Sequence, residues 1–236
     1  MLKLLRPFVF LFIAAFAAEA SAAERYFVMI FGSESVPKRA RYTHTWATIV
    51  KATAEPGPTE AYSLESQTIS WMPANLKIRP LALRPECGVN LGLQATFRDS
   101  FCKGECVAMW GPYELTPEHG PVVWSRVAVQ VSRLNSGCVL YKCVDPDTGP
   151  KSTYMSNCIH AVSDLDRHLP RPAYNELLNN GMDASENLVR VMLSRHRFDP
   201  NVTHDWVAQA LGVGPCVQRR AAPAVCGSTY TPACAK

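Results

Sequence analysis

The chain has 236 residues, a formal net charge of +4 and a hydrophobic fraction of 47%. This length suffices for one well-packed core. The small positive charge argues against nucleic acid or a strongly anionic surface as the partner. We therefore expect a single domain over residues 24–212 and no nucleic-acid partner.

The first residues have the pattern of a secretory signal peptide. Lys3 and Arg6 precede an apolar run over residues 8–18, and the small residues 20–23 follow. The apolar run is shorter than the roughly twenty residues that a membrane span requires, which makes an uncleaved anchor helix the weaker alternative. We expect residues 1–22 to be removed and the product to be periplasmic or extracellular. No second run of this kind follows, so no integral membrane segment is expected after removal.

The remaining chain has an odd number of cysteines. In an exported protein cysteines are expected to pair, so one of them stays single or pairs with another molecule. If Cys158 is the single one, the other eight can form four disulfides, whose pairing the sequence leaves open. A zinc site is the less favoured alternative, and we predict no metal and no cofactor. The nine are Cys87, Cys102, Cys106, Cys138, Cys143, Cys158, Cys216, Cys226 and Cys234.

Strands dominate the first half of the chain and helices the second. Short runs rich in apolar, β-branched and aromatic residues predict strands over 26–31, 42–50, 67–71, 106–110 and 138–143. Apolar residues at helical spacing predict helices over 90–101, 121–135, 158–168, 183–195 and 203–211. Residues 213–236, rich in Pro, Ala, Gly and Cys, are expected to be a tail pinned by disulfides. This mixed order predicts an α+β fold with a small antiparallel sheet packed against helices.

The strongest chemical signal is Cys158. It follows Ser156 and Asn157, either of which suits the N-cap of the helix that Cys158 would open. Backbone N–H groups at a helix start favour the thiolate, the nucleophilic form of cysteine, and can also stabilise an oxyanion. An efficient thiol nucleophile needs a base within hydrogen-bond reach, and His44 on the strand over 42–50 is our candidate. His160, two residues beyond the thiol on the helix, is interpreted as structural.

These two segments resemble the circularly permuted papain-like superfamily, which includes NlpC-type and lecithin:retinol acyltransferase-like cysteine hydrolases. The resemblance rests on Thr43-His44-Thr45-Trp46 and Asn157-Cys158-Ile159-His160, in which histidine precedes cysteine, the reverse of the order in papain. It spans residues 26–168 and leaves residues 169–236 outside. It implies Cys158 as the nucleophile, His44 as the general base and the backbone N–H of Cys158 in the oxyanion hole, with Asn157 and His160 beside them.

The third catalytic position is where the chain departs from that superfamily. A polar residue on the next strand usually orients the histidine, and here Gln67 or Thr68 is our choice. We therefore expect an exported thiol hydrolase that cleaves an amide or ester through an acyl-enzyme on Cys158. Its substrate would be a peptide, a cell-wall component or an acyl ester. The rival expectation is a non-enzymatic, disulfide-stabilised exported binding protein with the same fold.

Overall fold

The computed structural model describes residues 23–55, 61–144, 154–166 and 180–224. The expected signal peptide lies outside this part of the chain. So do residues 225–236 of the expected tail and the end of the helix expected over 158–168. Within the described residues, no helix is both long enough and apolar enough to span a membrane.

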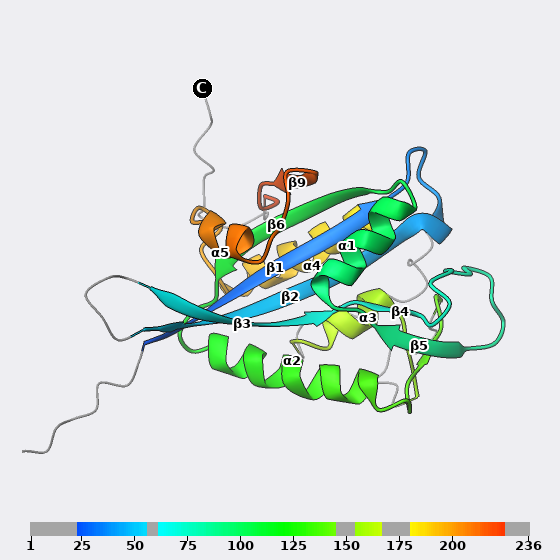
Figure 1. The fold of residues 1–236 in the computed structure, drawn as a ribbon, viewed down its shortest axis with the longest axis horizontal. Coiled ribbons are helices and arrows are strands. Elements are labelled where there is room, and N and C mark those ends of the chain that lie inside the picture. The colour runs from blue at the N-terminus through cyan, green and yellow to red at the C-terminus, as the bar shows by residue number, and fades with distance from the viewer. Residues whose placement is uncertain (1–22, 56–60, 145–153, 167–179, 225–236) are drawn as a thin grey trace, which may run out of the picture.

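The main sheet has five strands in the order β3-β2-β1-β6-β9 (Figure 1). Its neighbours are antiparallel, except that β9 runs parallel to β6. Because β9 joins this sheet, the ordered domain extends beyond residue 212, into the segment expected to be a tail. The strands are β1 (Glu24–Glu34), β2 (Thr43–Ala54), β3 (Tyr62–Ile69), β6 (Cys106–Glu114) and β9 (Val217–Arg220).

A second, smaller sheet has the order β4-β5-β7-β8. All four strands are short. In place of the strand expected over 138–143, the structure has a strand of two residues. The strand expected over 67–71 is divided at Ser70 between the two sheets. The members are β4 (Trp71–Pro73), β5 (Glu86–Asn90), β7 (Leu140–Tyr141) and β8 (Met155–Ser156).

Helices cover both faces of the main sheet, which confirms the α+β class (Figure 1). One face packs against α1 (Leu93–Cys102) and α5 (Asp205–Ala210). The other packs against α2 (Gly120–Asn135), α3 (Cys158–Ser163) and α4 (Met182–Ser194). A 3₁₀ helix, η1 (Ala40–Tyr42), leads into β2. We call these two surfaces of the sheet the α1 face and the α3 face.

Alternation along the central strands gives each face its own core. On β1, Phe27, Met29 and Phe31 pack on the α1 face, whereas Val28 and Ile30 pack on the α3 face. Successive side chains of a strand point to opposite faces, so a strand with two covered faces is apolar throughout. The long buried run of β1 follows from this arrangement. On β1, the face that a side chain occupies therefore depends on whether its residue number is odd or even.

Among the element boundaries that differ from expectation are the end of β6 and the start of α4. The strand expected to stop before Gly111 and Pro112 continues as β6 to Glu114, with a shift in its register against β1 between Val28 and Ile30. The helix expected from Asp183 begins one residue earlier and is preceded by Gly181, whose φ of 58° favours glycine. The Thr45 hydroxyl donates to the Gly181 carbonyl at 3.0 Å, which attaches the start of α4 to β2.

No disulfide joins two of the cysteines that the structure describes. Cys87, Cys102, Cys138 and Cys216 are exposed, whereas Cys226 and Cys234 lie outside the described residues. The described part of the chain therefore lacks the disulfides that were expected to stabilise it. It also contains no cluster of three or more His, Cys, Asp or Glu side chains suited to a metal ion.

Candidate functional site

Cys158 begins α3, as expected, and Asn157 is its N-cap. The backbone N–H of His160 donates to Asn157 Oδ1 at 2.8 Å, which satisfies one donor of the first helical turn. The other end of the same amide, Asn157 Nδ2, donates to the Cys143 carbonyl at 3.1 Å. Asn157 thus fixes the start of α3 and ties it to the chain after β7.

The thiol of Cys158 has little space around it. Cys158 is 8% exposed and packs with Ile159 and with Ala184 of α4. It lines a pocket of about 20 Å³, to which Thr43 and Cys143 also contribute. A volume of this size holds about one water molecule. In this conformation the thiol therefore has no room for an acyl substrate.

His44 lies in the other core, on the α1 face. Its Nε2 is 2.8 Å from the hydroxyl of Ser70, and its ring stacks on Trp46 with the ring centres 5.3 Å apart. Trp46 in turn meets Phe97 of α1 edge-on. The hydroxyl of Thr96 on α1 donates to the same Ser70 oxygen at 2.8 Å. His44 is 3% exposed.

The structure therefore does not bring His44 and Cys158 together. On β2, His44 and Trp46 occupy the α1 face, while Thr43 and Thr45 point to the α3 face, where Cys158 and α4 lie. The expected thiol–imidazole pair therefore does not form in this structure. Successive side chains of a strand point to opposite faces, and position 44 points to the face opposite the thiol. Burial also lowers the pKa of His44 to about 3, so the imidazole is a weak base.

The two candidates for the third position are separated in the same way. Thr68 lies on the face of His44, where its hydroxyl meets that of Thr48 at 2.9 Å. Gln67 is half-buried and pairs in register with Ile49, a residue of the α3-face core. The residue that does contact His44 is Ser70, two positions after Thr68. Side chains two positions apart on an extended chain point to the same face, so counting two residues on from Thr68 would have identified Ser70.

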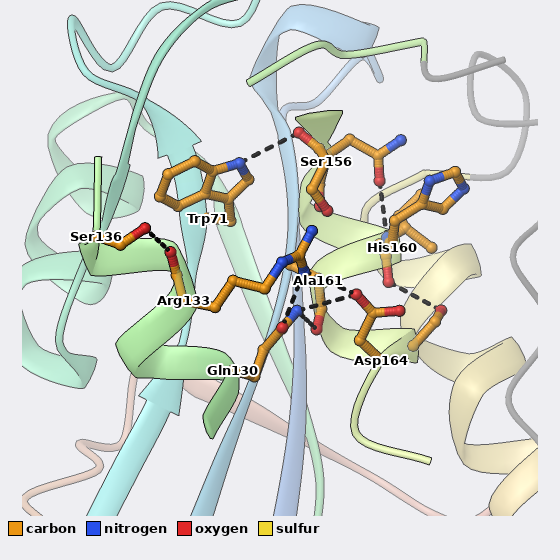
Figure 2. A network of polar contacts seen from close by, with 11 residues as sticks. Trp71, Gln130, Arg133, Ser136, Ser156, His160, Ala161 and Asp164 are labelled. Atoms are coloured by element: carbon orange, nitrogen blue, oxygen red, sulfur yellow. Dashed lines mark hydrogen bonds and ion pairs between the residues drawn. The ribbon is translucent and has the colours of Figure 1, made fainter. Parts of the chain in front are cut away.

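Polar side chains of α2 contact α3 and the residue that follows it (Figure 2). Gln130 Nε2 donates to the Ala161 carbonyl at 3.0 Å and to Asp164 Oδ2 at 3.2 Å. Arg133 forms an ion pair with the same carboxylate at 3.2 Å. The buried imidazole of His160 points away from this group in Figure 2. These contacts position α3, and His160 is part of its buried surface.

A larger cleft adjoins the small pocket. It has a volume of about 600 Å³ and lies between η1 and the chain after Ile78. Ala40 and Ile78 line both the cleft and the Cys158 pocket, so the two are neighbours. Arg39, Arg41 and Arg79 are among the residues that line the cleft. This cleft could not be predicted from the sequence, because two segments that are distant in the chain form it together.

In comparisons with known proteins, no family model, no curated protein and no solved structure matches this chain.

Proposed function

We propose that this protein is an exported binding protein whose ligand occupies the cleft between η1 and the chain after Ile78. The observation that carries this proposal is the cleft itself, whose volume of about 600 Å³ lies in the range of small-molecule sites. Export rests on the N-terminal signal-peptide pattern of the sequence. Binding without turnover is consistent with a thiol in a pocket of about 20 Å³ and with His44 in the opposite core.

A variant that fills the cleft tests this proposal. We expect fragments that bind the mature protein in a ligand-observed NMR screen to lose binding in Ala82→Trp, since Ala82 lines the cleft. Ala74→Trp is the matched control, because Ala74 is exposed and is not among the residues that line the cleft. Hits that bind both variants equally well would place the ligand elsewhere, and an absence of hits for the wild-type protein would count against a binding role.

The second candidate is the thiol hydrolase of permuted papain-like fold. Its support is the position of Cys158 at a capped helix start beside the cleft. Opening of the small pocket would join the thiol to the cleft. The base would then have to be a residue other than His44.

Thiol labelling separates the two candidates. For a binding protein we expect iodoacetamide to modify Cys158 slowly, with the pH dependence of an ordinary thiol, and His44→Ala to leave the labelling rate unchanged. Mass-spectrometric mapping across a pH series measures this rate. Fast labelling of Cys158 that persists at acidic pH would instead support a thiolate activated by a neighbouring group, and with it the hydrolase.

A further inference from the structure

The cleft combines positive charge with apolar surface. Arg39, Arg41 and Arg79 are all exposed, and all three line it. Ile78 and Leu81 are the large aliphatic side chains of the lining. Ile78 is buried, whereas Leu81 is 83% exposed, a large apolar side chain left to solvent. A ligand that complements this surface needs both a negative group and an apolar body.

Within the described residues, no carboxylate neutralises the charges of these three arginines. Among the residues that the structure describes, no carboxylate lies within ion-pair distance of Arg39, Arg41 or Arg79. Other arginines, such as Arg25 with Glu114 and Arg197 with Asp166, have such partners. Arg41 instead lies over the ring of Tyr42, with its Cζ 5.8 Å from the ring centre.

Three arginines that line one cleft, with no ion-pair partner among the described residues, raise the local concentration of anions. Arginine also matches the geometry of carboxylate, because its planar fork can donate two parallel hydrogen bonds. The apolar residues of the cleft would add the burial of a hydrocarbon body. We propose that the cleft binds a small organic carboxylate with an apolar body. This inference rests on the proposed binding function and names its ligand class.

A pair of fluorescent probes that differ only in the charged group tests the inference on the whole mature protein. Pyrenebutyrate carries a carboxylate, and pyrenebutanol carries a hydroxyl on the same apolar body. We expect pyrenebutyrate to bind at least tenfold more tightly than pyrenebutanol. Raising the sodium chloride concentration from 20 to 500 mM should weaken only the binding of pyrenebutyrate, because salt screens exposed charges.

Substitution of the three arginines supplies the structural control. The triple variant Arg39→Gln, Arg41→Gln, Arg79→Gln should lose the tenfold preference and keep the weak binding of pyrenebutanol. The matched control replaces three exposed arginines outside the cleft and changes the net charge equally: Arg98→Gln, Arg195→Gln and Arg220→Gln. The control should retain the preference. Circular dichroism checks that both variants are folded.

The outcomes distinguish this inference from the proposed function. Equal binding of the two probes to the wild-type protein, abolished by Ala82→Trp, would overturn the carboxylate assignment and leave a binding cleft. A preference for pyrenebutyrate lost equally in both triple variants would show a net-charge effect and would also overturn the assignment. Binding of neither probe would count against both.

Discussion

At the scale of single residues, His44 is an ionisable group whose pKa is strongly shifted by its surroundings. It is a histidine in an aromatic core, hydrogen-bonded through Nε2 to Ser70, while no described residue accepts or donates a hydrogen bond at its Nδ1. Burial, together with the nearby positive charge of Lys103, lowers its pKa to about 3. A charged imidazole would have to give up its hydration without gaining a counterion. His44 therefore stays neutral in the folded protein at physiological pH.

We predict that His44 makes the protein sensitive to acid. The pKa of His44 is about 3 in the folded protein and 6.5 in the unfolded chain. The unfolded chain therefore binds the proton more readily. The stability that this difference provides is complete above pH 6.5 and is lost as the pH falls towards 3, by up to about 5 kcal/mol. Urea unfolding at pH 7 and pH 4.5 should show a smaller acid loss in His44→Gln than in wild type.

The exposed His196 provides the control for this prediction. His196 has a φ of 52°, a value that asparagine tolerates, so His196→Asn should lose stability with acid as the wild type does. Burial raises the pKa of Glu105, which acts in the opposite direction, but Glu105 is present in all three proteins and its effect cancels. An acid loss in His44→Gln equal to that of wild type would contradict the prediction.

At the scale of elements, the contact between β1 and α4 is unusually close. A Cβ built on Gly32 would come within 2.7 Å of Met182 Cα and 2.9 Å of the Gly181 carbonyl. Both are backbone atoms, so a side chain at Gly32 would push the start of α4 away from the sheet. The hydroxyl of Ser185 shares this contact, donating to the Phe31 carbonyl at 2.6 Å. Glycine at position 32 thus lets α4 approach the sheet near the start of α3.

We predict that Gly32→Ala lowers the free energy of unfolding by about 1–3 kcal/mol, the usual cost of overpacking a core. Denaturant unfolding followed by circular dichroism measures this change. Gly214→Ala is the matched control, since nothing lies within 4 Å of a Cβ at that position, and it should stay within about 0.5 kcal/mol of wild type. A neutral Gly32→Ala variant would mean that α4 moves away at little cost.

The sequence predicted elements well where the apolar residues followed a clear helical spacing or formed a long continuous run. The apolar stripe of α2 and the long apolar run of β1 placed both elements correctly. β9 was missed because Val217–Arg220 is a short, mostly polar strand at the edge of the sheet, where β6 is its one partner among the described strands. The face that His44 occupies could not be predicted, because β2 is buried on both sides. The alternation correctly grouped His44 with Trp46, but nothing local indicates which face α3 covers.

At the scale of the whole molecule, the two cores depend on each other through shared strands. β1 contributes Phe31 to the α1-face core and Ile30 to the α3-face core. If a shared strand moves to improve the packing of one core, its side chains in the other core move as well. The packing of the two faces is therefore coupled. The domain should therefore unfold as one cooperative unit although its cores do not merge.

We predict that Phe31→Ala destabilises both faces together. The ring of Phe31 stacks on Trp46 and is fully buried. Its loss should lower the free energy of unfolding by about 3–5 kcal/mol. Amide hydrogen exchange should report the same loss for α1 on one face and for α2 on the other. Protection in α2 that remains at its wild-type level, while α1 alone becomes labile, would show two independent units.

The position of β1 in the middle of the main sheet also determines the order in which the fold can be completed during synthesis. β1 is the first strand of the described chain, yet its partner β6 begins more than seventy residues after β1 ends, and the edge of β6 is covered only by β9. A nascent chain can form the β1–β2 hairpin early, but one side of β1 then stays open until residues 106–114 have emerged. An apolar strand with an open edge is a site for aggregation. A ribosome that stalls before β6 would therefore release a fragment that depends on chaperones for its solubility.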